Sequence, residues 1–225
     1  MEKNDWHCLL FTGHKNTDCE ADLVASLSGL GKVTKMSLYH KTSGSEEILP
    51  TLDVTELQDL LYQKDAVVYV PDVPDWNASL ESLVENEVKE LTYVLNAAQA
   101  AGISNFIFIS DIEGMGAAPR PVAIDENSLW SGQTNANDVQ KFWYLCEQEC
   151  RRAAEEGLNV LIIAASRMAK DPALQRTHVY TTSCLSLANS IQKCLMKPTS
   201  LQKIFVIQLV DQAIPTITTE VKYPR

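Results

Sequence analysis

The sequence predicts an α/β fold, a doubly wound parallel sheet with helices on both faces, and three observations support this prediction. Short apolar runs typical of buried strands alternate along the chain with segments whose apolar residues recur at helical spacing. Glycine or proline follows most of these segments, as expected where a strand or a helix ends. The chain has 225 residues, 45% of them hydrophobic, which is enough to bury one sizeable core.

Each expected element has its own pattern. The first strand is an apolar run that ends at Gly13, and the first helix carries leucines at i, i+4 and i+7 from Leu23. The longest apolar stripe at helical spacing ends at Gly102. A loop rich in glycine and proline is expected at 113–136. The strands are expected at 8–12, 33–39, 66–70, 106–110, 158–164 and 203–209. The helices are expected at 23–30, 55–62, 79–101, 139–156 and 181–194.

The net charge and the cysteine spacing limit the binding partners and the cellular compartment that we expect for this protein. The formal net charge of -10 argues against a surface for nucleic acid or for an anionic membrane. The first residues lack the basic and apolar regions of a signal peptide, and no run of about 18 apolar residues predicts a membrane span. The six cysteines are irregularly spaced, so we expect reduced thiols in a cytoplasmic protein. Cys146 and Cys150 share a helix face; we expect packing rather than metal binding, and predict no metal site.

In a doubly wound sheet, ligands bind beyond the carboxyl ends of the strands, where the strand order reverses. Any site is therefore expected at that edge of the predicted sheet. The corresponding positions are Gly13, Tyr39, 70–74, 110–114 and 164–167.

Several stretches along the chain together match the motifs of one enzyme family. They are NFIFISDIEGM at 105–115, IDENSLWS at 124–131 and KFWYLCEQEC at 141–150. In this order they resemble extended short-chain dehydrogenases/reductases, closest to plant cinnamoyl-CoA reductases and dihydroflavonol reductases. Those enzymes have a strand ending in Thr-Ser-Ser, a loop with Asp-Glu-Ser-x-Trp-Ser and a helix that opens with Trp-Tyr-x-x-x-Lys. EVKELTYVLNAAQAAGISN at 87–105 resembles their Asn-Val-x-Gly-Thr-x-Asn-Val-Leu helix, and the resemblance covers roughly residues 7–172. It implies a Rossmann-like fold.

The resemblance also implies three catalytic positions, and this chain matches them unevenly. Tyr144 stands where the family has its acid/base tyrosine. Gln148 stands where the family has a lysine, and a neutral amide cannot stabilise a phenolate. The position of the serine that polarises the substrate carbonyl falls on Asp111, or on Ser110 if the register shifts by one. An ionised Asp111 would repel a developing oxyanion. Tyr144 is therefore either an acid/base or a part-buried aromatic on a helix.

The phosphate loop of the family, Thr-Gly-x-x-Gly-x-x-Gly, begins here at Thr12 and Gly13. Asn16 and Cys19 replace the second and third glycines, which normally allow the backbone to approach the pyrophosphate and the helix to pack closely. Residues 17–20 instead match a capping box, whose carboxylates would lie where a phosphate binds. We favour a capped helix without a nucleotide at this position.

The resemblance implies further cofactor positions along the edge of the sheet. Lys35 and Tyr39 occupy the region where these reductases use arginines for the adenosine 2′-phosphate. Asp53 matches an aspartate near the adenine. Val70 and Pro71 end the third strand, where the family has small residues against the cofactor. NADP(H) is the cofactor that the resemblance implies, and the altered loop argues against its binding.

The resemblance divides the chain into a degenerate NAD(P)-binding domain at 1–172 and a reduced remnant of the C-terminal substrate lobe at 173–225. We favour a degenerate, non-catalytic family member with a binding or regulatory role. Its partner is then a protein, or a small molecule in the altered nucleotide cleft. One alternative is an active NADP(H)-dependent reductase of phenylpropanoid-like carbonyls, with Tyr144 as acid/base. The other is a structural fragment or isoform that needs a partner.

Overall fold

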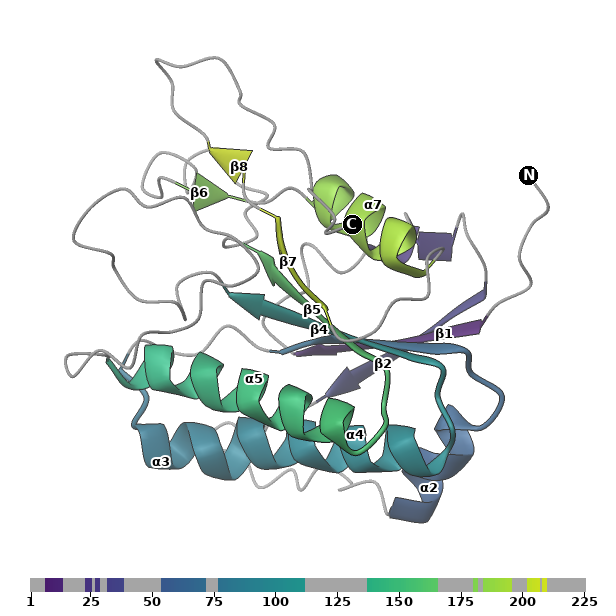
Figure 1. The fold of residues 1–225 in the computed structure, drawn as a ribbon, viewed down its shortest axis with the longest axis horizontal. Coiled ribbons are helices and arrows are strands. Elements are labelled where there is room, and N and C mark those ends of the chain that lie inside the picture. The colour runs from purple at the N-terminus through teal and green to yellow at the C-terminus, as the bar shows by residue number, and fades with distance from the viewer. Residues whose placement is uncertain are drawn as a thin grey trace.

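We describe the fold from a computed structural model (Figure 1). The residues that it describes are 7–13, 23–25, 27–28, 32–38, 54–71, 77–111, 137–165, 180–181, 184–195, 202–206 and 208–209.

The described strands form one six-stranded sheet of order β2-β1-β3-β4-β5-β7, in which every pairing is parallel. This confirms the predicted parallel sheet. β1 pairs with β2 on one side and with β3 on the other, so the order of the strands reverses at β1. The strands are β1 (His7–Gly13), β2 (Lys32–Leu38), β3 (Ala66–Val70), β4 (Asn105–Asp111), β5 (Val160–Ala165) and β7 (Gln202–Val206).

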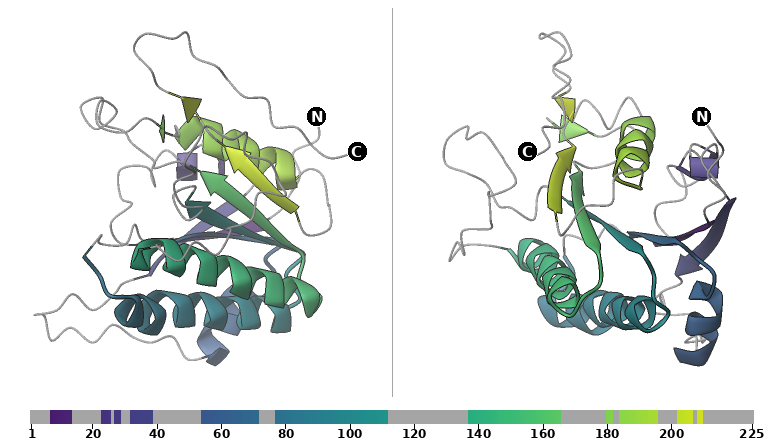
Figure 2. Two further views of the ribbon diagram at one scale, coloured as in Figure 1. Left: turned by 60° about the vertical axis from the view of Figure 1, so that its left-hand side comes forward. Right: turned by 45° about the vertical axis from the view of Figure 1, so that its right-hand side comes forward.

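Helices cover both faces of the sheet, as predicted (Figure 2). On one face lie α2 (Val54–Leu61), a continuous helix made of α3 (Leu80–Leu83), the π-turn η2 (Val84–Val88) and α4 (Lys89–Ala100), and α5 (Asp138–Glu155). The other face is covered by α7 (Cys184–Leu195) and by the helical residues 23–25 and 27–28. None of the described helices combines the length and the apolar character needed to cross a membrane.

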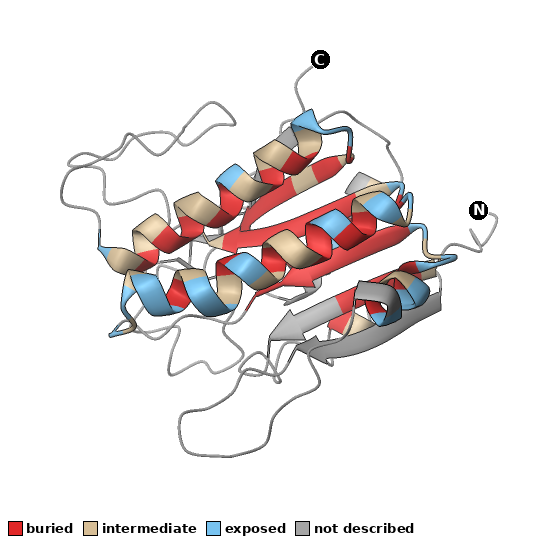
Figure 3. Cartoon of the chain, turned by 90° about the horizontal axis from the view of Figure 1, so that it is seen from below, coloured by how far each residue is buried: buried red, intermediate tan, exposed pale blue. Residues whose placement is uncertain are grey.

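The side chains of β4 show how the two faces are assigned. Phe106 and Phe108 pack among the residues of α4 and α5, whereas Ile107 and Ile109 pack with those of α7. Successive side chains of a strand point to opposite faces, so this alternation continues to the end of the strand. The side chains of β3, β4 and β5 are buried on both faces, and Figure 3 shows these strands behind the helices that cover one face. This double burial explains their continuous apolar sequences.

The C-terminal part of the chain differs in detail from the expected elements. The prediction that a helix begins at residue 181 is wrong. Tyr180–Thr181 forms β6, which pairs antiparallel with β8 (Gln208–Leu209), and the helix begins at Cys184. Tyrosine and threonine fit a strand better than a helix, and this pairing outweighs the helical pattern. The strand expected at 203–209 is divided between β7 and β8.

Two further predictions concern the organisation of the chain. The glycine- and proline-rich loop expected at 113–136 lies outside the described residues. The segment 173–225, expected as the remnant of a substrate lobe, supplies β7 to the main sheet and α7 to its cover. These elements of the segment therefore share the core of the sheet.

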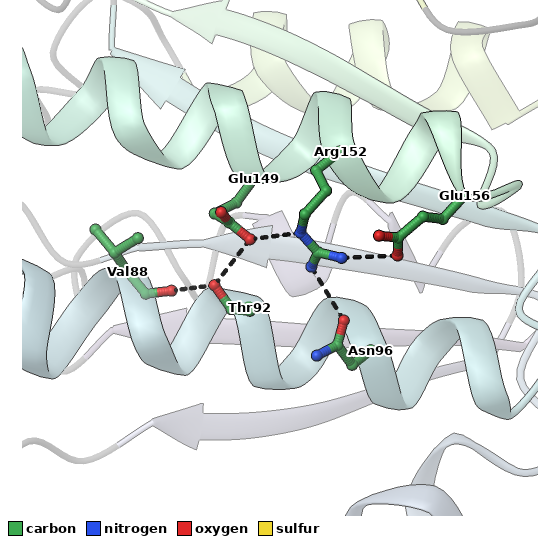
Figure 4. Close-up of polar contacts among 6 residues, drawn as sticks. All are labelled: Val88, Thr92, Asn96, Glu149, Arg152 and Glu156. Atoms are coloured by element: carbon green, nitrogen blue, oxygen red, sulfur yellow. Dashed lines mark hydrogen bonds and ion pairs between the residues drawn. The ribbon is translucent and has the colours of Figure 1, made fainter.

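Polar contacts join α4 and α5 (Figure 4). The guanidinium of Arg152 donates to Glu149 at 2.9 Å and to Glu156 at 2.7 Å on its own helix, and to Asn96 on α4 at 3.0 Å. The hydroxyl of Thr92 on α4 lies 3.2 Å from Glu149. Exposed pairs of this kind contribute about 1 kcal/mol or less. The network therefore makes this surface polar and adds little to stability.

Candidate functional site

The carboxyl ends of β1 and β3 lie side by side at the point where the strand order reverses. Thr12 pairs with Val70 in the parallel register. Gly13 and Pro71 follow directly in the chain, and Pro71 is buried. The structure thus brings together four of the residues predicted for the cofactor, at the edge where ligands of such sheets bind.

Lys35, another predicted cofactor residue, lies elsewhere on the sheet. It pairs with Leu10, three positions before β2 ends at Leu38. At about 3.3 Å per residue, its backbone is roughly 10 Å from the carboxyl edge. The remaining predicted positions, Asn16, the capping box at 17–20, Tyr39 and Asp53, lie outside the described residues and stay predictions.

The two residues predicted for the serine position, Ser110 and Asp111, lie on opposite faces of the sheet. Ser110 follows Phe106 and Phe108 in the row of β4 that faces α5. Asp111, the last residue of β4, is half-buried and belongs by alternation to the row that faces α7. Ser110 is only 2% exposed, and its Oγ donates a hydrogen bond of 2.8 Å to Oε1 of Glu147 on α5.

Glu147 is a site residue that the sequence analysis missed. It is 9% exposed and lies within the buried stripe of α5. The sequence did contain a signal for it, because Glu147 is a charged residue at helical spacing within a stripe of otherwise apolar positions. Buried carboxylates are nearly always hydrogen-bonded. The other members of the stripe are Val139, Phe142, Trp143, Cys146, Cys150 and Ala153.

The helix that carries Glu147 also positions the other two predicted catalytic residues. α5 begins with a reciprocal capping box between Asn137 and Gln140, which fixes its first turn. Tyr144 is half-buried and precedes Glu147 by three residues, so both lie on one face of α5. Gln148 is exposed. The structure therefore brings together Ser110 and Glu147, with Tyr144 one turn away, and leaves the lysine position at the surface.

A second polar contact, which is partly buried, joins the neighbouring strand β3 to α4. The Tyr69 hydroxyl donates to Oε1 of Glu90 at 3.0 Å. Burial raises the pKa of Tyr69 well above its ordinary value, and the nearby carboxylates of Glu90 and Glu87 raise it further. Glu87 belongs to the π-turn, and π-turns are frequent at functional sites. The sequence analysis did not predict this turn.

Comparisons with known proteins bear on the fold. No protein-family model matches the chain, and no curated protein matches its sequence. The terminal R domain of the myxalamid PKS-NRPS pathway matches with a TM-score of 0.69 and 16% identity, over 91% of this chain and 66% of the R domain. UDP-N-acetylglucosamine 4-epimerase from Bacillus cereus matches at 0.66 and 15%, over 89% and 78% of the two chains. A short-chain dehydrogenase/reductase superfamily protein from Agrobacterium tumefaciens, solved with bound NAD, matches at 0.56 and 21%, over 72% and 50%.

The chain has a Rossmann-like α/β fold similar to that of these solved structures. This confirms the Rossmann-like α/β prediction. At 15–21% identity the likeness concerns the fold. The chain spans 66% of the length of the R domain and 50% of that of the Agrobacterium protein.

Three buried thiols lie in the described core of this Rossmann-like fold. Burial raises the pKa of Cys8 to about 12, against a weaker lowering by a backbone hydrogen bond from Val68. Burial likewise raises the pKa of Cys146 and Cys150 well above the ordinary value. Protonated thiols are poor nucleophiles and poor metal ligands. Within the described parts of the chain, no three side chains of the ligating types are grouped to hold a metal, and Cys146 and Cys150 pack in the core as expected.

The raised pKa of Cys8 predicts how the free energy of unfolding depends on pH. A thiol in the unfolded chain ionises near pH ~8.5, whereas folded Cys8 stays protonated up to about 12. Because the pKa of Cys8 is higher in the folded chain, its contribution to the free energy of unfolding is complete below about pH 8.5. This contribution is lost as the pH rises from about 8.5 towards the folded pKa of about 12. In that range the free energy of unfolding falls by up to about 1.4 kcal/mol per pH unit.

Urea titrations at a series of alkaline pH values measure this dependence. The free energy of unfolding of Cys8→Ala is expected to fall less steeply with pH than that of the wild type. The control is Tyr62→Phe, at an exposed side chain. Equal slopes for Cys8→Ala and the wild type would contradict the prediction.

Proposed function

We propose that this chain is a non-catalytic relative of the cinnamoyl-CoA and dihydroflavonol reductases, and that it binds a small molecule at the carboxyl edge of its sheet. The supporting observation is the hydrogen bond from Ser110 to Glu147. Carbonyl reduction needs a donor placed where negative charge develops on the carbonyl oxygen. A serine hydroxyl has one proton, and that of Ser110 is given to a carboxylate of the protein itself.

The position four residues after Tyr144 supports the same proposal. An acid/base tyrosine needs a lowered pKa to act near neutral pH, and a neighbouring cation is the usual cause. Gln148 is neutral and exposed, and it cannot supply that charge. The carboxyl group against Ser110 is that of Glu147, and a negative charge there disfavours an oxyanion. The residues at this end of the edge therefore do not fit NADP(H)-dependent carbonyl reduction.

One observation favours an active reductase as a second candidate. Tyr144 lies on the face of α5 that carries Glu147, one turn from the contact with Ser110. Thr12, Gly13, Val70 and Pro71 also share the edge where a dinucleotide binds in this class of sheet. In this candidate, Tyr144 would protonate the reduced carbonyl oxygen of a phenylpropanoid-like substrate.

Titration with NADPH and with NADH separates the two candidates. Melting temperature and tryptophan fluorescence report binding, and absorbance of NADPH in the presence of cinnamaldehyde reports turnover. A ligand at 100 times its dissociation constant adds about 2.7 kcal/mol of stability, which raises the melting temperature by several degrees. We expect no shift at about 1 mM of either cofactor and no consumption of NADPH.

The control for this titration is Gly13→Val, which would block the approach of a phosphate to the end of β1. A micromolar stabilisation by NADPH that Gly13→Val abolishes would contradict the expected absence of cofactor binding. Consumption of NADPH would contradict the non-catalytic proposal and support the reductase.

A further inference from the structure

The hydroxyl group of Ser110 donates its proton in a hydrogen bond to Glu147. Ser110 Oγ is the donor and Glu147 Oε1 the acceptor of their hydrogen bond, so the serine hydroxyl proton points at Glu147. Both side chains are largely buried, at 2% and 9% exposure, which strengthens their hydrogen bond. What the Ser110 oxygen still offers is its remaining lone-pair capacity, which accepts but does not donate.

The packing around this pair holds it in place. Phe108 precedes Ser110 in the same row of β4, and its ring centroid lies 6.4 Å from that of Trp143 on α5. Trp143 in turn packs against Phe142, with centroids 5.0 Å apart. All three side chains are buried. A pair supported in this way keeps its geometry when a ligand arrives.

We propose that Glu147 is a positioning residue that turns Ser110 into a hydrogen-bond acceptor, so that the site selects ligands presenting a hydroxyl or amine hydrogen over ligands presenting a carbonyl oxygen. This rests on the proposed binding of a small molecule at the carboxyl edge of the sheet, because Ser110 is the penultimate residue of β4. A carbonyl oxygen placed against Ser110 meets another acceptor and loses the hydrogen bonds that it had in water. An alcohol in the same place donates to Ser110 and keeps its hydrogen bond.

A matched pair of probes tests this preference. 1-Phenylethanol and acetophenone differ by an alcohol in place of a ketone, and protein-observed NMR titration gives a dissociation constant for each. The wild type is expected to bind the alcohol about five-fold more tightly, as one net hydrogen bond provides. Ser110→Ala removes the acceptor and is expected to abolish the preference. Glu147→Leu releases the proton of Ser110 and is expected to abolish or reverse it.

The control is Ser190→Ala on α7, a buried serine on the opposite face of the sheet, which is expected to keep the wild-type ratio. A merely structural role of Glu147 would change stability and leave this ratio unchanged. If Glu147→Leu does not fold, Ser110→Ala decides the question, because serine and alanine differ by one oxygen.

The proposal is overturned if the wild type binds neither probe, binds both equally, or prefers acetophenone. It is also overturned if Ser110→Ala keeps the wild-type ratio. These outcomes are distinct from those of the cofactor titration. Turnover of NADPH would end the non-catalytic proposal whatever the probe ratio, whereas a ratio of one would end this inference and leave the absence of catalysis standing.

Discussion

Replacing Phe108 by alanine is expected to lower the free energy of unfolding by about 3–5 kcal/mol. Phe108 is fully buried at the centre of the face covered by α4 and α5. Its ring lies 6.2 Å from that of Tyr69 on β3 and 6.4 Å from that of Trp143 on α5, between centroids. The truncation therefore removes a large apolar side chain and leaves a cavity that rigid neighbours on two elements cannot fill.

Urea unfolding monitored by tryptophan fluorescence and by circular dichroism measures this effect. The matched control is Tyr62→Ala after α2, where the side chain is 69% exposed and truncation is expected to cost about 0.5 kcal/mol or less. A loss below about 1 kcal/mol for Phe108→Ala would contradict the packing of α5 on β4. Phe108 also packs beside the hydrogen-bonded pair Ser110 and Glu147. Phe108→Ala is therefore expected to weaken the preference for 1-phenylethanol over acetophenone.

The strands and the long helices were predictable because a doubly covered parallel sheet leaves strong local patterns. β3 and β4 are buried on both faces, and such strands are apolar at nearly every position. α5 has an apolar stripe along 18 residues, which few other structures produce. The edge predicted for the ligand was also accessible from sequence. Given the topology of a parallel sheet, the carboxyl ends of β1 and β3 meet at the same edge.

The features that sequence reasoning missed depend on partners far away in the chain. Glu147 acquires its role only because α5 places it against Ser110, 37 positions earlier. The pairing of Tyr180 with Leu209 joins two very short strands, and neither has a pattern of its own. The π-turn at Val84–Val88 adds one residue to a helical turn, so the buried residues Leu83 and Val88 are five positions apart. The sequence analysis treated 79–101 as one regular helix and did not use this spacing.

Lys35 illustrates a different limit. The strand expected at 33–39 and the observed β2 (Lys32–Leu38) both place it within the strand, several positions before the carboxyl edge. The family resemblance, and not its position in the strand, suggested a cofactor contact for this residue, and that contact stays a prediction.

Replacing Leu187 by aspartate is expected to destabilise the whole sheet by at least about 3 kcal/mol, because it buries an unpaired charge. Leu187 on α7 is fully buried, and it packs in one cluster with Ile107 of β4 and Ile163 of β5. If α7 detached, it would expose the apolar face formed by these strands, which favours aggregation. Hydrogen exchange of the β4 and β5 amides measures the effect.

Asn189→Asp is the matched control, because it places the same carboxylate on an exposed position of the same helix. It is expected to change the free energy of unfolding by about 0.5 kcal/mol or less. The comparison decides how the chain is organised. If Leu187→Asp lost the protection of α7 alone while the amides of β4 and β5 stayed protected, the segment 173–225 would be an independent lobe docked on a self-sufficient domain. Equal loss of protection in α7, β4 and β5 would instead mean that the sheet cannot fold without this segment, because its second apolar face has no other cover of comparable size among the described elements.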